Sequence, residues 1–187
     1  MKILITGNPD KTLANELSKI YPSAVFVSRI SNIDLTTTAG HKRLADMSVD
    51  FDIFINCSAL WKFNQTVLLD TVYKKCLEFN RALHIINIGS TTDRVKNGKP
   101  WLYNAEKKAL RDYSNTLALS GVWSDNLPKI TYISFGTLSN NQEKHPERKC
   151  IDMQTAAGYI KWVIDQPKHI AINEISIDPM QGNNWYE

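Results

Sequence analysis

The sequence lacks the features of several protein classes. Its three cysteines, Cys57, Cys76 and Cys150, show no C-x-x-C or Cys/His spacing, and their odd number argues against a disulfide framework. No apolar run approaches transmembrane length, and Lys2 opens the first apolar segment without the n-region and h-region of a signal peptide. We therefore expect a cytoplasmic protein without a metal site, with neither secretion nor membrane insertion.

The sequence also lacks a strong charge of one sign. The net charge is +3, and the basic residues are scattered without an aromatic-basic stripe, which disfavours nucleic acid as a partner. The 187 residues, 43% of them hydrophobic, can build one good core but not comfortably two. We therefore expect a single domain over residues 1–187.

Short apolar runs alternate along the chain with stripes of helical spacing. The runs are rich in β-branched residues, as in strands that are buried on both faces of a parallel sheet, and lie with the turns that follow them at 2–7, 24–27, 51–59, 83–88, 129–137 and 170–177. The stripes predict helices at about 13–21, 41–47, 64–79, 101–119 and 155–165. This order predicts an α/β protein with a doubly wound parallel sheet, a three-layer Rossmann-like fold.

A serine, a tyrosine and a lysine stand out in the second half of the chain. Ser90 follows the run 83–88, which Gly89 should end, at the sheet edge where such folds bind ligands. Tyr103 and Lys107 are four residues apart and share one face of the predicted helix. An ammonium beside a phenol favours the phenolate, and a serine hydroxyl can hold a substrate carbonyl against it. A surface lysine beside a half-buried tyrosine is the structural alternative.

With its serine ahead of a Y-x-x-x-K helix, the sequence resembles the short-chain dehydrogenase/reductase family, in a shortened and divergent form. The resemblance implies a single NAD(P)-binding Rossmann-fold domain with strand order 3-2-1-4-5-6-7. It also implies a catalytic set of Ser90, Tyr103 and Lys107, in which Lys107 lowers the pKa of Tyr103 and binds the nicotinamide ribose. Asn64 corresponds to the family's fourth catalytic residue, although it could equally be a helix N-cap.

The glycine-rich turn of the family is degraded here. The family pattern T-G-x-x-x-G-x-G aligns with residues 6–13, where only Gly7 remains, while Lys11 and Leu13 replace the other two glycines. We expect Gly7 and Asn8 to bind the cofactor phosphates, with the charge of Lys11 substituting for lost backbone contacts. Asn8 before Pro9 could instead cap the first helix.

Arg29 follows the second predicted strand, where such folds meet the adenosine ribose. A cation suits a 2′-phosphate, so we expect NADP(H) to be favoured over NAD(H). Asp34 matches an acidic residue that the family places near the adenine, although a turn-capping role is as plausible.

The resemblance implies further cofactor contacts at two other strand ends. Asn56, Ser58 and Ala59 occupy the family's N-N-A-G turn, where Asn56 could also stabilise the sheet by a hydrogen bond to its neighbour; the alternative is an ordinary strand-end asparagine. Gly136 and Thr137 occupy the turn below the nicotinamide, where we expect the glycine to adopt a positive φ or to allow a close approach.

We therefore predict an NADP(H)-dependent oxidoreductase that interconverts a carbonyl and an alcohol on a small molecule. The alternative is a non-catalytic nucleotide-sensing or scaffold protein that retains the fold. The resemblance implies a homodimer or homotetramer formed through the helices of Asn64 and Tyr103, with Leu68 and Val72 buried between subunits.

Overall fold

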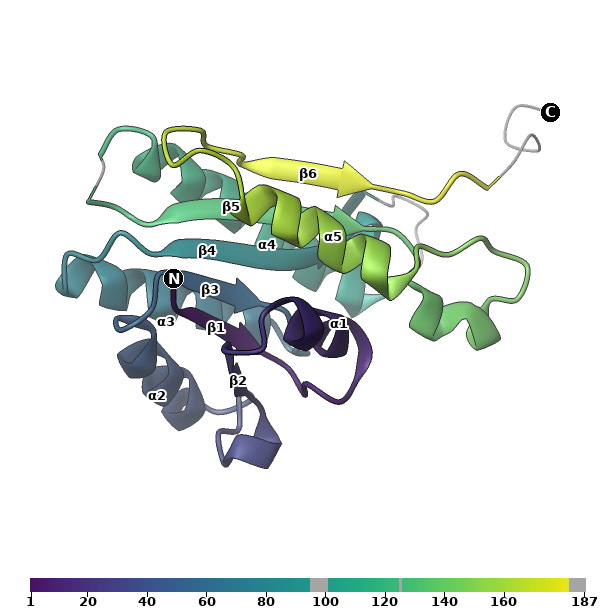
Figure 1. Cartoon of the computed structure of the whole chain (residues 1–187), viewed down its shortest axis with the longest axis horizontal. Coiled ribbons are helices and arrows are strands. Elements are labelled where there is room, and N and C mark those ends of the chain that lie inside the picture. Colours follow the sequence, from purple (N-terminus) through teal and green to yellow (C-terminus); the bar gives the residue numbers. More distant parts are fainter. Residues whose placement is uncertain (95–100, 125, 182–187) are drawn as a thin grey trace.

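The computed structural model describes residues 1–94, 101–124 and 126–181. A six-stranded parallel sheet lies between two layers of helices (Figure 1). The strands are β1 (Ile3–Thr6), β2 (Val25–Val27), β3 (Ile53–Asn56), β4 (His84–Ser90), β5 (Lys129–Phe135) and β6 (Glu174–Ile177). The helices are α1 (Thr12–Ile20), α2 (Thr38–Ser48), α3 (Asn64–Glu78), α4 (Leu102–Gly121) and α5 (Met153–Ile164). The predicted fold class is confirmed.

The strand order is β2-β1-β3-β4-β5-β6, and every neighbouring pair is parallel. The implied order of seven strands is wrong, because the described part of the chain lacks the outermost strand beside β2. Residues that follow β2 form a short 3-10 helix, η1 (Arg29–Ser31), and then turn at Asp34 into α2. No outermost strand therefore forms beside β2, and the remaining strands keep the expected order.

The core consists of two clusters because successive strand residues point to opposite faces of the sheet. On β1, Leu4 packs toward α2, α3 and α4, while Ile3 and Ile5 pack toward α1 and α5. Figure 1 shows α1 and α5 together in front of the sheet, with the other three helices behind it. Both faces of the central strands are therefore buried, which explains their continuous apolar runs.

The predicted oligomer contacts on α3 are wrong. Leu68 and Val72 are fully buried within the single chain, where they pack in the core with residues of α2 and α4. They are therefore not free to meet another subunit, and the oligomeric state stays a prediction of the resemblance. Among the described residues, no helix combines the length and apolarity that a membrane crossing requires.

Candidate active site

The site lies where β4 ends and α4 begins. The sequence predicted that β4 would end at Gly89, and this prediction is wrong. The strand continues through Ser90, which pairs with Phe135 of β5. Gly89 is required because the buried Tyr132 crosses from β5 directly over it: a Cβ on Gly89 would lie 2.0 Å from the Tyr132 hydroxyl. The backbone N–H of Ser90 donates to that hydroxyl across 3.4 Å, so Tyr132 contacts the strand end that carries the serine.

Tyr103 lies in the first turn of α4, half-buried, and the structure brings it to Ser90. Burial raises the pKa of the Tyr103 phenol, a hydrogen bond with the Ser90 side chain lowers it, and the charge of Glu106 raises it. The net pKa is raised, and Lys107 is not among the causes of this shift, so the lowering of the Tyr103 pKa by Lys107 stays a prediction. A phenol with a raised pKa is protonated at neutral pH, which suits a proton donor.

Lys107 lies one turn further along α4 and is almost completely buried. Its ammonium lies 5.5 Å from the centre of the Tyr103 ring and donates to Oε1 of Gln65 at 2.7 Å and to the carbonyl of Ile88 at 3.3 Å. Burial lowers the pKa of Lys107 to about 8. The ammonium therefore lies next to the phenol while held by two neutral acceptors.

Gln65, and not Asn64, is the α3 residue that reaches Lys107. The Gln65 amide nitrogen also donates to the carbonyls of Asn56 and Ile88, at 2.9 and 3.0 Å. Asn64 instead donates to the carbonyl of Trp61 at 2.7 Å, and Phe63 occupies the N-cap position of α3. The sequence alignment missed Gln65 because the expected residue type stands one position earlier.

Asn56 connects β3 to the neighbouring strand β4, as the resemblance implied. Its side-chain amide donates to Oδ1 of Asn87 on β4 at 3.0 Å and to the carbonyl of Gln65 at 3.1 Å. The backbone N–H groups of Cys57 and Ser58 both donate to the Thr6 hydroxyl, which fixes the start of the loop. Ser58 is partly exposed there and Ala59 is exposed, so both line the loop that follows β3.

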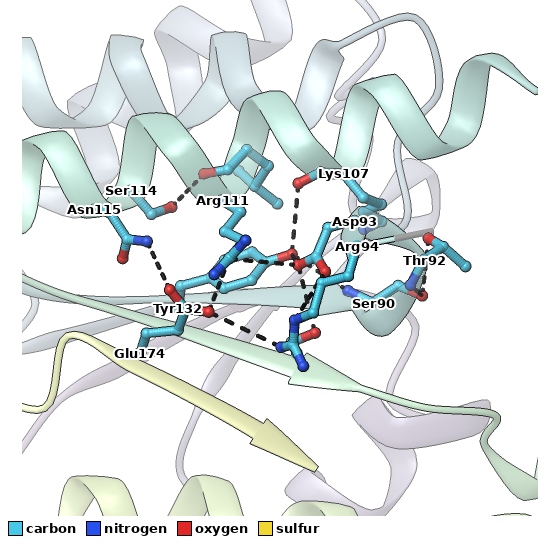
Figure 2. Close-up of polar contacts among 12 residues, drawn as sticks. Ser90, Thr92, Asp93, Arg94, Lys107, Arg111, Ser114, Asn115, Tyr132 and Glu174 are labelled. Atoms are coloured by element: carbon cyan, nitrogen blue, oxygen red, sulfur yellow. Dashed lines mark hydrogen bonds and ion pairs between the residues drawn. The ribbon is translucent and has the colours of Figure 1, made fainter. Parts of the chain in front are cut away.

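A second polar cluster surrounds Asp93, close to Ser90 (Figure 2). The Tyr132 hydroxyl donates to Oδ2 of the buried Asp93 at 2.9 Å, while Arg94 and Arg111 approach the same carboxylate at 3.4 and 4.0 Å. Arg111 also pairs with Glu174 of β6 at 2.8 Å. Burial raises the pKa of Asp93 against the lowering effects of Tyr132 and the two arginines. The cluster joins the residues after β4 to α4, β5 and β6.

The turn after β1 keeps part of a phosphate site. Gly7 has φ +144°, and a Cβ there would lie 2.9 Å from Cβ of Ala14, so this position requires glycine. Asn8 accepts the N–H of Asp10 and does not cap α1: the N-cap is the exposed Lys11, which offers no side-chain acceptor to the first N–H groups. Leu13 is buried in the core, where the family pattern has glycine.

Arg29 and Asp34 lie near each other beyond β2, and both are exposed. Asp34 accepts hydrogen bonds from the backbone and hydroxyl of Thr36, and these lower its pKa, with a smaller contribution from the charge of Arg29. Asp34 therefore caps the turn before α2, as the structural alternative held, whereas Arg29 begins η1 with its charge in solvent.

Gly136 ends β5 without the expected positive φ. Its requirement is a close approach: a Cβ on Gly136 would lie 2.6 Å from Oδ1 of Asp178 and 2.7 Å from Pro179. Thr137 follows, partly exposed, and its carbonyl accepts the N–H of Ile151 at 2.9 Å. Both residues reach the same edge of the sheet as Ser90.

Both the sequence and the fold of this chain are similar to those of known proteins. The sequence is 23% identical to an uncharacterized oxidoreductase of Staphylococcus saprophyticus, in an alignment that covers 96% of this chain and 87% of the relative. No protein-family model matches the sequence.

Solved structures that cover 98% or more of this chain include the following three. A short-chain dehydrogenase from Bacillus anthracis aligns with a TM-score of 0.74 at 13% identity, over 98% of its own length. Serine dehydrogenase complexed with NADP+ gives 0.73 at 15%, and a 4-hydroxyisoleucine dehydrogenase mutant complexed with NADH and succinate gives 0.76 at 16%, each over its full length. The resemblance to the short-chain dehydrogenase/reductase fold is thus confirmed, in a divergent form.

Proposed function

We propose that this protein is an NADP(H)-dependent oxidoreductase that interconverts a carbonyl and an alcohol on a small molecule. The observation that carries the proposal is the buried ammonium of Lys107, which lies 5.5 Å from the centre of the Tyr103 ring, together with a Ser90 side chain near enough to lower the pKa of the phenol. The curated relative is described as an oxidoreductase, and two of the similar structures are dehydrogenases bound to nicotinamide cofactors.

In the direction of carbonyl reduction, Tyr103 is the general acid. Its raised pKa keeps the phenol protonated at neutral pH, and the Ser90 hydroxyl holds the substrate oxygen within reach. The proton passes from the phenol to that oxygen as the C–O bond becomes that of an alcohol. The ammonium of Lys107 stabilises the phenolate that remains, and Gln65 holds the ammonium in place.

The residues present fit a dinucleotide. The close packing at Gly7, the uncapped N-terminus of α1 and the exposed Lys11 together offer backbone donors and a cation to a pyrophosphate. Arg29 would contact a 2′-phosphate, Gly136 and Thr137 would border the nicotinamide, and Lys107 would contact its ribose. A bound nicotinamide would supply the hydride in reduction, and the chain supplies the proton.

The buried Leu13 favours a second candidate, a non-catalytic nucleotide-sensing or scaffold protein. A leucine side chain fills the position where the family has its third glycine, which removes one route for the backbone to approach the phosphates. Such a protein would have no need for Tyr103 beside Lys107.

Titration with NADPH and NADH tests cofactor binding. We expect NADPH to bind more tightly than NADH, Arg29→Ala to remove most of that difference, and Lys11→Ala to weaken both cofactors. Arg43→Ala is the matched control, because it removes the same charge as Arg29→Ala. The Arg43 side chain, on α2, donates to the carbonyl of Asn32. If neither cofactor bound the wild-type protein, the oxidoreductase proposal would fail.

Turnover tests the acid. Tyr103→Phe should reduce NADPH-dependent carbonyl reduction by about 10²- to 10⁴-fold, the range that a general acid contributes, with cofactor binding retained. Full turnover in this variant would reject Tyr103 as the proton donor. Hydride transfer by the wild-type protein would reject the non-catalytic candidate.

A further inference from the structure

Two tryptophans lie against the ring of the proposed acid. The Trp61 ring centre is 5.4 Å from that of Tyr103 and the Trp101 ring centre is 5.2 Å from it, with tilted planes in both pairs. Trp61 comes from the loop after β3, and Trp101 precedes the first residue of α4. Both indoles keep more than half of their surface exposed, 57% and 52%. Aromatic area is thus presented to solvent beside the reacting hydroxyl.

The backbone that carries Trp61 is strained. Lys62 and Phe63 are consecutive non-glycine residues with φ +59°, a left-handed conformation that costs free energy for each residue. Such strain persists only where the surroundings impose it, and it concentrates at ligand-binding sites.

Two hydrogen bonds impose this conformation. The N–H of Lys62 donates to Oε1 of the buried Glu106 on α4 at 2.7 Å, and the Asn64 side chain donates to the carbonyl of Trp61 at 2.7 Å. Glu106 is adjacent to Lys107, so the helix that carries the acid also fixes the Trp61 loop. A surface tryptophan with no ligand to contact would not require a buried carboxylate and two strained residues.

The two buried charged residues of α4 beside the rings have hydrogen-bond partners. Glu106 accepts from the Trp61 loop, and Lys107 donates to Gln65 and Ile88. The Tyr103 ring therefore has two indole rings as neighbours, and the ammonium that lies 5.5 Å from its centre is held by neutral acceptors. Flat aromatic groups gain additional free energy against such rings beyond the burial of their area.

We infer that the site takes a substrate with an aromatic ring attached to its carbonyl or alcohol carbon, and that Trp61 and Trp101 bind that ring. The position of the reacting oxygen rests on the proposed function, whereas the binding of the ring does not. The preference for an aromatic ring is therefore measurable without turnover.

The experiment compares the binding of benzamide and cyclohexanecarboxamide, followed by NMR of the ligand with and without NADPH. The two amides have rings of similar size, differ in aromaticity and are not reduced by a nicotinamide. We expect benzamide to bind about fivefold or more tightly, the effect of about one aromatic contact. Trp61→Leu and Trp101→Leu should each reduce this preference, and the double variant should abolish it.

Two controls separate the indoles from general effects. Trp123→Leu removes a tryptophan that is 87% exposed beyond the far end of α4 and should keep the preference. Trp61→Phe should retain most of the preference for benzamide, because an aromatic ring is kept at this position. Equal binding of the two amides, binding of neither, or a preference that survives the double variant would overturn the inference. Each of these results leaves the NADPH titration intact, whereas a protein without cofactor binding could still prefer benzamide.

Discussion

The ammonium of Lys107 donates to Oε1 of Gln65 across 2.7 Å and so joins α4 to α3 directly behind the proposed acid. Both side chains are almost completely buried, with 5% and 4% of their surface exposed. Because the acceptor is neutral, the pKa of Lys107 is set mainly by burial and lies at about 8. Catalysis that needs the charged ammonium should therefore weaken as the pH rises through this value.

Two different substitutions of Gln65 should move this pH dependence in opposite directions. Gln65→Leu removes an acceptor and should lower the pKa of Lys107, so that the alkaline fall in NADPH-dependent turnover moves to lower pH. Gln65→Glu places a carboxylate beside the ammonium and should move the fall to higher pH. Profiles of turnover against pH measure both changes.

Gln154→Leu is the control, because Gln154 is exposed on α5. Asn64→Ala tests whether Asn64 or Gln65 is the α3 residue that acts on Lys107. A shifted alkaline limb in this variant would return that role to Asn64, and an unshifted limb would exclude it.

Gly89→Ala should destabilise the fold. The new Cβ would lie 2.0 Å from the Tyr132 hydroxyl and 2.1 Å from Cζ, inside a buried site that has little room to relax. Overpacking of this kind costs about 1–3 kcal/mol. Urea denaturation measures the loss of free energy of unfolding.

Gly158→Ala is the opposite case among the glycines. A Cβ there meets no atom within 4 Å, and Gly158 lies inside α5. Alanine should stabilise the helix by about 0.5–1 kcal/mol. Equal effects of the two glycine substitutions would show that Tyr132 does not occupy the space above Gly89.

Tyr132→Phe should destabilise the protein through Asp93. The lost hydroxyl donates to a buried carboxylate at 2.9 Å and accepts the N–H of Ser90, and unsatisfied buried groups cost about 1–3 kcal/mol each. Thermal and urea unfolding measure the change. Tyr159→Phe, at an exposed tyrosine of α5, should stay within about 0.5 kcal/mol of the wild type. Similar losses in both variants would contradict the assigned contact.

His84 should make the protein sensitive to acid. Burial is the main cause that lowers its pKa to about 3, and its ring contacts the Thr131 hydroxyl at 2.9 Å. An unfolded histidine titrates near 6.5, so the unfolded chain binds the additional proton between pH 6.5 and about 3. The buried His84 therefore lowers the free energy of unfolding progressively as the pH falls from 6.5 to about 3. Above pH 6.5 it has no such effect.

His84→Gln keeps a side chain that can bond Thr131 but does not titrate. The difference in Tm, wild type minus variant, should fall as the pH is lowered from 6.5 toward 3. A difference that stays constant with pH would show that His84 is not held neutral.

The sequence predicted most of the framework because its signals are local. The apolar stripes located α3 and α4 to within about two residues of their ends, and the buried runs gave all six strands. The additional outermost strand beside β2 was taken from the resemblance. Residues 28–37 are instead turn-forming, and they form η1 and the Asp34 turn.

The site was harder to predict because it depends on angles that spacing alone does not fix. Neighbouring helix residues point about 100° apart, so a shift of one position separates the exposed contact of Asn64 from the buried contact of Gln65. The pKa of Tyr103 depends on how deeply its side chain is buried. Leu68 and Val72 were assigned to a subunit interface from the resemblance, whereas they pack in the core of the single chain. Packing between distant elements decided each of these outcomes.

The loss of the outermost strand has a consequence for solubility. β2, with three residues, and β6, with four, end the sheet on its two sides. Exposed strand edges can template β-pairing between molecules, and short edges offer few free N–H and C=O groups for such pairing. A sheet whose two edge strands have only three and four residues is therefore protected against edge-to-edge aggregation, and the missing outermost strand leaves the shorter of them, β2, at one edge.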